Sequence, residues 1–485
     1  PTFKVRKNLT LRNSSNFNTN NFNLEVQGKW TNESGTTFTA GNSTVIMRST
    51  VAMVTETISS RDTTDNTFNN LLIAGPGIIN ALDNIKVIGN LRIDTLSTFS
   101  LSSNQLSLYG DFIVNGGTHQ FATSTVKLSN NITQNIISSS SDVPFYNLVI
   151  DNPQDVVATS IGGVNNGLII NNNLDLNSGN LIVHAGSTYR YAKLLNNLTR
   201  IGGGYVDGEL RKRVPINTAS ITYEVGHLKS YTPITLDFIG TGGTEGYLGI
   251  LSDTLGVSST PIQWTDAIPS DITPAGSTIN MLKHVARQIG IIKPLSSTFA
   301  LGTTREYNIT ATYIPGASPN GDIRNSADYN NFVGRIWNGS NWISPFYYGS
   351  KPVIGSLTPT TFQYSQLKDL GTLIFGEPGL ITYYTRASGN WDDINNWSTQ
   401  GYGGIVATSY PSQLSNNLKA YIGNNNNINL NLNITADNIS GDSSLVQVDS
   451  TGTLMLQDYI ISGSGAFRLM KNSVVGIGNS NGIVN

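Results

Sequence analysis

The stretch that decides the fold occurs twice: FKVRKNLTLRNSSNFNTNNFNLEVQGKW spans Phe3–Trp30, and IKVIGNLRIDTLSTFSLSSNQLSLYGDF spans Ile85–Phe112. The two copies align without gaps at an offset of 82 residues. The identical pairs are Lys4/Lys86, Val5/Val87, Asn8/Asn90, Leu9/Leu91, Ser15/Ser97, Phe17/Phe99, Leu24/Leu106 and Gly28/Gly110. Self-similarity at a fixed spacing is typical of proteins built from stacked units.

Short runs inside each copy alternate apolar and polar residues, as in Leu91–Ile93, Phe99–Leu101 and Leu106–Leu108, and Gly, Asn and Ser separate them. This alternation places one face of a strand in a core and the other in solvent. It predicts a β-solenoid with two or three short strands in each coil of roughly 20–25 residues. A third, partial copy begins at Leu168. A string of small β-sandwiches is the alternative.

The composition indicates an all-β protein without cysteine chemistry. The chain has 49 Gly, 57 Asn and no Cys, so it offers no disulfide framework and no thiolate nucleophile. A net charge of −2 argues against a nucleic-acid binder, which would carry a basic stripe. Asn tolerates left-handed corners and can stack in ladders, so we expect Asn at the corners between strands.

The density of Asn divides the chain into three regions. The first 200 residues hold 31 Asn, residues 201–319 hold three, and a second Asn-rich stretch follows Asn416. The middle part carries longer aromatic runs, such as Tyr307–Tyr313 and Phe332–Trp337, which are typical of an antiparallel sandwich. We therefore expect a β-solenoid over residues 1–195, a β-sandwich region over 196–380 and a second β-solenoid region over 381–485.

The titratable residues predict no catalytic, metal or cofactor site. The four His residues, at positions 119, 184, 227 and 284, are isolated in the sequence, with no second ligand at metal-binding spacing. Asp62 and Asp65 lie in a polar loop that we expect to be solvated, with a calcium site as the alternative. Asp392 and Asp393 are adjacent, and we expect this pair to cap the backbone amides of the Asn residues that follow. A glycosidase would instead need two carboxylates that flank a cleft.

Two tryptophan pairs are candidate packing or recognition elements. Trp337 and Trp342 flank an Asn-Gly turn and could pair on one face of a hairpin as a platform for a glycan, or fill the sandwich core. Trp391 and Trp397 are expected to pack where the tail region begins.

Four stretches along the chain carry a resemblance to a known group of proteins. They are Gly110-Asp-Phe-Ile-Val-Asn-Gly-Gly, Gly204-Tyr-Val-Asp-Gly-Glu-Leu210 with the later Tyr231-Thr-Pro-Ile-Thr-Leu236, Ser388-Gly-Asn-Trp391 with Trp397-Ser, and Gly463-Ser-Gly-Ala-Phe467 with Gly476-Ile-Gly-Asn-Ser-Asn-Gly482. As a set they resemble the large repeat-rich surface proteins of Bacteroidetes that type IX secretion exports, which include gliding-motility adhesins. Thr95 and Thr254 lie in Asp-Thr-Leu triplets, which match the short O-glycosylation motif of that phylum.

The resemblance implies an extracellular or cell-surface, outer-membrane-associated location. Both ends of the sequence continue the strand pattern, so we expect a segment of a longer polypeptide. The expected function is a non-enzymatic structural or adhesive module without a cofactor or a membrane span. Its expected partners are other segments of the same polypeptide, surface polysaccharide, or the secretion and outer-membrane machinery, and not nucleic acid. The alternatives are a carbohydrate-active β-helix enzyme, either a polysaccharide lyase or a hydrolase, and a glycan-binding module.

Overall fold

The computed structural model describes most of the 485-residue chain. The described residues are 2–60, 66–139, 142–160, 167–183, 191–227, 230–254, 279–316, 321–324, 327–328, 331–339, 342–343, 346–347, 360–407, 409–439 and 442–484. The structure is 54% strand and 1% helix, which confirms the all-β prediction. Two compact units are present: the described residues of 2–253 with 289–306 form the first, and residues 254, 279–288 and 307 onward belong to the second.

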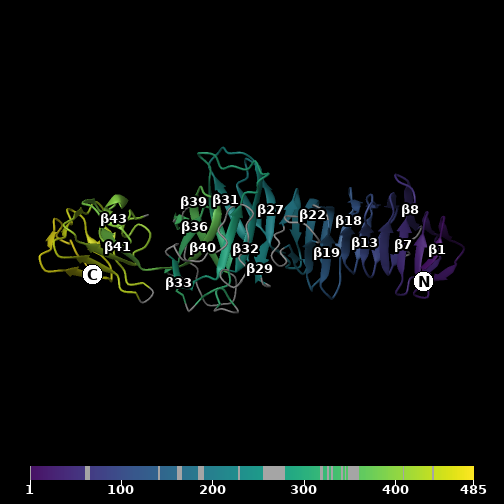
Figure 1. Ribbon diagram of the computed structural model, residues 1–485, viewed down its shortest axis with the longest axis horizontal. Coiled ribbons are helices and arrows are strands. Elements are labelled where there is room, and N and C mark those ends of the chain that lie inside the picture. Colours follow the sequence, from purple (N-terminus) through teal and green to yellow (C-terminus); the bar gives the residue numbers. More distant parts are fainter. Residues whose placement is uncertain are drawn as a thin grey trace. The chain divides into compact units, whose positions relative to one another are not determined.

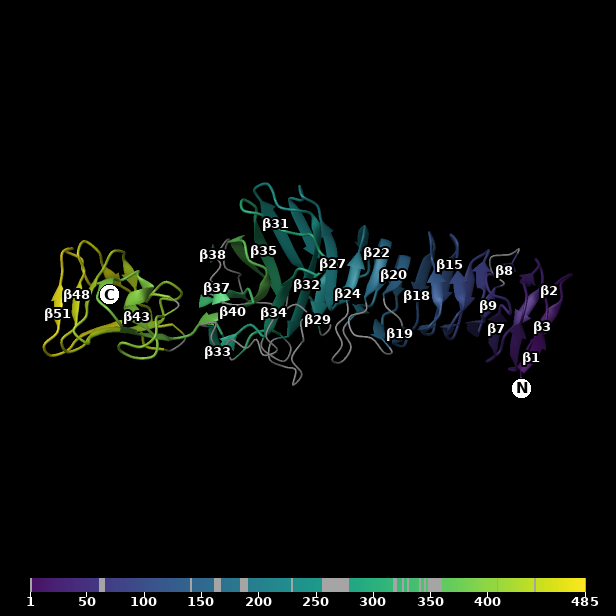
Figure 2. The ribbon, with the colours of Figure 1, turned by 45° about the horizontal axis from the view of Figure 1, so that its top comes forward.

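The first unit contains a β-solenoid in which successive coils place strands in shared sheets (Figures 1 and 2). Sheet 1 comprises β1 (Thr2–Val5), β4 (Asn23–Val26), β7 (Thr44–Arg48), β10 (Asn70–Ala74), β13 (Leu91–Asp94), β16 (Phe112–Asn115), β19 (Gln134–Ser138), β21 (Val156–Ser160), β23 (Leu181–Ile182), β26 (Val206–Asp207), β29 (Val225–His227) and β30 (Ser230–Tyr231). Sheet 2 comprises β2 (Leu9–Leu11), β5 (Trp30–Asn32), β8 (Thr55–Ser60), β11 (Ile78–Ala81), β14 (Thr98–Ser100) and β17 (Thr118–Gln120).

Sheet 3 forms a further face of the solenoid. Its strands in the first unit are β9 (Thr67–Phe68), β12 (Ile85–Val87), β15 (Gln105–Leu108), β18 (Thr125–Leu128), β20 (Val143–Asp151), β22 (Leu168–Ser178), β24 (Tyr191–Leu194), β25 (Asn197–Arg200), β27 (Glu209–Val214) and β32 (Gly246–Thr254). In the first coils a separate parallel pair is formed by β3 (Asn16–Asn18) and β6 (Thr37–Thr39).

Alternating side chains build the core of the solenoid as the sequence predicts. In β13, Leu91 and Ile93 are buried while Arg92 is exposed, and Leu91 lies opposite Phe112 of the next coil. Partner residues in neighbouring coils are 20 residues apart between Leu71 and Leu91, and 26 apart between Val45 and Leu71. The stacked coils confirm the predicted solenoid, because each coil buries its inner residues against the next one.

The two copies of the 82-residue repeat lie on different faces of the solenoid. Phe3–Val5 forms part of β1 in sheet 1, whereas the equivalent Ile85–Val87 forms β12 in sheet 3. Likewise β2 belongs to sheet 2 and its counterpart β13 to sheet 1. The repeat length is therefore not a whole number of coils. Each of these strands in the second copy lies on a different face of the solenoid from its counterpart in the first copy.

Parallel stacking continues past residue 195, because β26 pairs in parallel with β29. Antiparallel pairing then begins within the first unit. β27 pairs with β32, and β28 (Ser220–Tyr223) pairs with β31 (Ile234–Ile239). The division of the chain at residues 195 and 380 stays a prediction.

Further strands come before the tail, and the pairs whose register is described are antiparallel. They are β33 (Ile279–His284), β34 (Arg287–Ile292), β35 (Glu306–Tyr313), β36 (Val333–Trp337), β37 (Trp342–Ile343), β38 (Phe346–Tyr347), β39 (Thr360–Leu367) and β40 (Gly371–Pro378). Within the second unit β36 pairs with both β37 and β40, and β39 pairs with both β35 and β38. A cluster of rings, including Tyr313, Phe362 and Phe375, packs between these strands, with ring centroids 4.8 to 5.7 Å apart.

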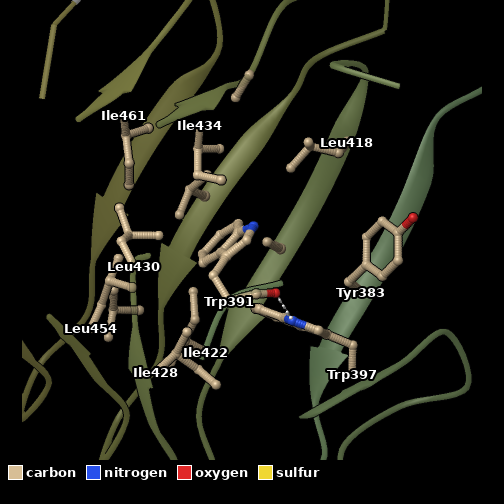
Figure 3. Packing of buried hydrophobic residues seen from close by; sticks show 14 of the residues in the cluster. Tyr383, Trp391, Trp397, Leu418, Ile422, Ile428, Leu430, Ile434, Leu454 and Ile461 are labelled. Carbon is tan, nitrogen blue, oxygen red and sulfur yellow. Dashed lines mark hydrogen bonds between the residues drawn. The ribbon is translucent and has the colours of Figure 1, made fainter. Parts of the chain in front are cut away.

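The tail returns to parallel coils around its own core. Its elements are β41 (Ile381–Thr385), β42 (Gly389–Asn390), the 3₁₀ turn η2 (Ile394–Asn396), β43 (Trp397–Ser398), β44 (Leu418–Ile422), β45 (Asn427–Asn429), β46 (Ile434–Thr435), β47 (Leu445–Val448), β48 (Thr453–Met455), β49 (Ile461–Ser462), β50 (Ala466–Leu469) and β51 (Val474–Gly476). Trp391 and Trp397 lie fully buried among the aliphatic residues of this core (Figure 3). They pack against Tyr383 at the start of the tail, as the sequence predicts.

Candidate functional site

Asn and Asp side chains link successive coils of the solenoid through backbone amides. Asn70 Oδ1 accepts a hydrogen bond from the N–H of Asn90 at 2.8 Å, Asn90 Oδ1 accepts from Asp111 at 2.8 Å, and Asp111 Oδ1 accepts from Asn135 at 2.7 Å. The same contact joins Asn8 to Lys29, Asn21 to Asn42, Asn23 to Thr44, Asn84 to Gln105, Asp142 to Gly167, Asp155 to Asn180 and Asn180 to Tyr205. We call this set the Asx ladder.

The Asx ladder explains why the repeat retains both Asn8/Asn90 and Gly28/Gly110. A Cβ on Gly28 would lie 2.5 Å from Asn8 Oδ1, and a Cβ on Gly110 would lie 2.5 Å from Asn90 Oδ1. Each Gly directly precedes the amide that the Asn oxygen accepts from. The ladder confirms one predicted role of Asn. The positive φ angles of Asn13, Asn20, Asn21, Asn424 and Asn425 confirm the other, at corners.

A concave, charged surface lies on the outer face of sheet 3 and is the best candidate for a binding site. We call it the basic groove; it is a hollow of about 330 Å³ lined by Tyr191, Lys193, Arg211, Arg213, Glu245 and Tyr247, with residues 296–298 beside them. Alternation along β24 and β27 turns these side chains outward, because Ala192, Leu194 and Leu210 point into the core.

Tyrosine rings and carboxylates hold the three cations of the basic groove in place. The Arg211 guanidinium lies 3.5 Å from the centroid of the Tyr191 ring and donates to both carboxylate oxygens of Glu209, at 2.6 and 2.8 Å. Lys193 Nζ lies 4.2 Å from the centroid of the Tyr247 ring. The exposed Arg213 donates to Glu245 at 2.7 Å.

Tyr191 is a neutral donor within this arrangement. Burial, and then the Asp142 carboxylate, raise the pKa of Tyr191 to about 12. Its hydroxyl donates to Asp142 Oδ1 at 3.0 Å. Burial likewise raises the pKa of Tyr247, against the opposing charge of Arg213.

A second hollow, of about 540 Å³, lies on the same sheet face. We call it the amide groove; it is lined by Thr125, Asn147, Asn172, Asn173, Asp175 and Asn197, with Leu198 and Thr199 beside them. Asn172 donates to Asn147 Oδ1 at 2.8 Å, and Asn147 donates to Thr125 at 3.2 Å. The strand β22 lines the amide groove and connects it to the basic groove, because its first half pairs with β24 and its second half with β25.

The predicted tryptophan pair forms on one hairpin face. Trp337 lies directly opposite Trp342 across the antiparallel ladder, with ring centroids 5.5 Å apart. Both rings are half-buried, and Trp342 packs against Ile279 and Ile374. The pair therefore contributes to packing, and its contact with a glycan stays a prediction.

The predicted glycosylation positions differ in what the structure describes. Thr95 is exposed in a turn and donates to the carbonyl oxygen of Asn115 at 3.1 Å. Thr254 ends β32, and its side chain lies outside the described part of the structure, as do Asp62, Asp65 and His184. Glycosylation at Thr95 and Thr254 stays a prediction.

His227 is not isolated, contrary to the interpretation of the sequence. Its Nδ1 lies 2.9 Å from Asp207 Oδ1 and its Nε2 lies 3.1 Å from Asp253 Oδ1, and all three side chains are only 10% to 11% exposed. His227 and Asp207 are 20 residues apart, about one coil, so the coil spacing was the signal that could have joined them. Among the described residues, no group of three or more His, Asp or Glu side chains is arranged to hold a metal ion.

Two other polar residues have structural roles. His119 lies in the core, where its Nε2 donates to the carbonyl oxygen of Pro144 at 2.8 Å. Asp393 Oδ1 accepts from the backbone amide of Asn395 at 3.0 Å, which confirms the predicted capping role of this Asp.

Comparisons with known proteins found no match: no family model, no curated protein and no solved structure matches the chain. In the described residues, no helix has the length and apolar character needed to cross a bilayer.

Proposed function

We propose that the chain is a non-enzymatic structural and adhesive module of a large extracellular surface protein. The observation that carries the proposal is the unbroken parallel pairing from β1 to β29, reinforced by the Asx ladder. Each coil is joined to the next by strand hydrogen bonds and by side-chain contacts such as that between Asn90 and Asp111.

Such a column suits a mechanical role, because neighbouring coils share strand hydrogen bonds and a continuous apolar core. The net contribution of one hydrogen bond to stability is about 0.5–1.5 kcal/mol, so the repeated Asx contacts stabilise each junction between coils. We also infer that the antiparallel strands between the two solenoid regions form a β-sandwich, with the Phe362 and Phe375 rings in its core. In the order of the sequence, a compact domain would then separate the two solenoid regions.

The likeness of the Gly110–Gly117 and Gly463–Phe467 stretches to Bacteroidetes surface proteins supports an extracellular location and export by type IX secretion. Treatment of intact cells of the source organism with a protease tests the location. We expect loss of the chain from intact cells while a cytoplasmic marker survives. Survival of the chain until the cells are lysed would contradict the proposed location.

Single-molecule stretching of the full chain tests the mechanical role. We expect the solenoid to open in repeated small steps, each close to the contour length of one coil. Gly110→Ala should lower the opening force, because it disturbs one junction between coils, whereas Gly403→Ala, a Gly with open space around it, should not. A single low-force event that releases all coils together would refute the load-bearing role.

The basic groove favours one alternative function, a carbohydrate-active enzyme, because it gathers Lys193, Arg211 and Arg213 on a β-helix surface. Incubation of the chain with polygalacturonate tests this alternative. We expect no new reducing ends and no unsaturated uronate. Cleavage that is lost in Lys193→Gln would establish the enzyme and remove the non-enzymatic proposal.

A further inference from the structure

We propose that the basic groove binds the carboxylate groups of an acidic, uronate-containing polysaccharide, and that the amide groove contacts the neighbouring sugar hydroxyls. The proposal supplies a ligand for the proposed adhesive role and rests on that role. It does not depend on the proposed mechanical role, which the stretching experiment tests by itself.

The first argument is the charge balance of the basic groove. Arg211 is neutralised by Glu209, and Arg213 by Glu245. In the described part of the chain, no carboxylate forms an ion pair with Lys193. Lys193 is therefore the lining cation that no described carboxylate pairs with, in a hollow that a ligand can enter, while the further carboxylate, Asp142, accepts a hydrogen bond from the Tyr191 hydroxyl.

The second argument is that the fold places like charges side by side. Lys193 of β24 and Arg211 of β27 are direct partners in a parallel ladder, where neighbouring strands lie about 4.8 Å apart. Two adjacent cations on one face repel each other unless an anion lies between or beside them. Glu209 beside Arg211 offsets part of this repulsion, and a ligand carboxylate at Lys193 would relieve the remainder.

The third argument is pre-organisation of the cations. The Tyr247 ring lies under Lys193 and the Tyr191 ring lies under Arg211, at centroid distances of 4.2 and 3.5 Å. Cation–π contacts of this kind hold the charged groups in place before the ligand arrives, which reduces the entropy lost on binding. One face of each tyrosine ring is thus occupied by a cation, so charge recognition dominates over stacking of sugar rings.

The fourth argument identifies the rest of the ligand. Next to the cations, on the same sheet face, Asn147, Asn172 and Asn197 line the amide groove. A carboxamide has two N–H donors and an oxygen with two lone pairs, so Asn172 keeps one donor and one acceptor position beyond its contacts with Asn147 and Asn196. A polymer with both hydroxyl and carboxylate groups satisfies both grooves, whereas a small anion satisfies only the first.

Isothermal titration of the full chain with sodium polygalacturonate tests the proposal, with neutral pullulan and inorganic phosphate as separate arms. We expect binding of polygalacturonate that weakens as NaCl is raised, because added salt screens the charges. We expect no binding of pullulan and no competition by millimolar phosphate.

Three variants locate the site. Lys193→Gln should weaken polygalacturonate binding about tenfold, since loss of one close charge pair is worth at least about 1.4 kcal/mol. Lys193→Arg should retain binding. The matched control is Lys127→Gln, which removes a cation from the same sheet that already pairs with Asp151 at 2.6 Å, and binding should be unchanged.

Far-ultraviolet circular dichroism and thermal melting of each variant separate loss of the site from loss of the fold. A folded Lys193→Gln chain with undiminished binding would overturn the proposal. Equal binding of pullulan, or full competition by phosphate, would also overturn it. In each of these cases the stepwise opening under force would be unaffected, so the load-bearing proposal would still stand or fall on its own test.

Discussion

The side-chain oxygen of Asn90 lies 2.5 Å from the point that a Cβ on Gly110 would occupy, and it accepts a hydrogen bond from the next amide, that of Asp111. No larger residue at position 110 could leave both the oxygen and the amide in place. The same relationship joins Asn8 to Gly28 on a different face of the solenoid. The same contact, from an Asn side chain to the backbone amide after a Gly, therefore joins neighbouring coils in both copies of the repeat.

Replacement of Gly110 should destabilise the solenoid. In Gly110→Ala the added Cβ would lie 2.3 Å from the backbone carbonyl of Gly89, so one coil must shift from its neighbour. We expect the free energy of unfolding to fall by about 2–3 kcal/mol, as for other overpacked sites. Urea unfolding followed by circular dichroism measures the change.

The control for this variant is Gly403→Ala. Gly403 has a φ of +68° but no atom within 4 Å of its Cβ position, so the substitution should cost only about 1–2 kcal/mol of backbone strain. An equal loss in the two variants would mean that the contact between coils contributes nothing.

Removal of one side-chain acceptor should weaken the Asx ladder without a clash. In Asn8→Leu the amide of Lys29 loses the oxygen that it donates to at 2.9 Å. We expect a loss of about 1 kcal/mol in the free energy of unfolding. Asn8→Asp keeps the acceptor and should retain the wild-type stability. If the Asp variant lost as much as the Leu variant, the hydrogen bond could not be the cause.

Stability of the solenoid should fall in mild acid because of His119. Burial among Phe112, Phe121 and Phe145 lowers the pKa of His119 from 6.5 to about 4, and the contact with the Pro144 carbonyl opposes this only in part. Between pH 6.5 and about pH 4, His119 is therefore protonated in the unfolded chain but neutral in the folded chain.

The free energy of unfolding should thus fall progressively between pH 6.5 and pH 4, by about 3 kcal/mol from this group. His119→Phe keeps an aromatic ring in the core and removes the titrating group. Urea unfolding at several pH values should show a smaller decrease in this variant. An unchanged pH dependence would show that His119 titrates normally.

The tail core should depend on its two buried tryptophans. Trp397 Nε1 donates to the carbonyl oxygen of Trp391 at 2.8 Å (Figure 3). Trp391 Nε1 donates to the carbonyl oxygen of Pro411 at 2.8 Å. Trp391→Ala removes a fully buried ring and should cost about 3–5 kcal/mol. Limited proteolysis should then cut within residues 381–484 first; an unchanged cleavage pattern would contradict this packing role.

Trp342→Ala separates packing from glycan recognition at the hairpin. Because Trp342 packs against Ile279 and Ile374, we expect a loss of stability of about 2 kcal/mol and unchanged binding of polygalacturonate. Retention of the folded variant on immobilised polygalacturonate measures the binding. Loss of retention without loss of stability would instead support a glycan platform at Trp337 and Trp342.

Part of this architecture could be predicted from residue patterns. Alternation in stretches such as Leu91–Ile93 and Leu106–Leu108 indicated strands with one buried face, and their recurrence indicated stacked coils. The shared Asn8/Asn90 and Gly28/Gly110 positions were visible as identities. Their physical connection was not visible, because the oxygen and the amide that it contacts are one coil apart.

The basic groove could not be predicted, because its members come from separate segments. Lys193, Arg211 and Tyr247 lie on three strands, and β32 enters the sheet antiparallel to β27. No spacing along the chain marks such a set. For His227 a signal does exist along the chain, because Asp207 lies 20 residues earlier, about one coil.

The sequence by itself determined the period-2 burial of each strand and the approximate length of a coil, because both follow from the local order of apolar, Asn and Gly residues. Only the tertiary structure decided that the two copies of the repeat occupy different faces and that Lys193 and Arg211 meet on one surface. Those relationships depend on how many residues fill each corner between strands, which shifts the angular position of every later strand around the core.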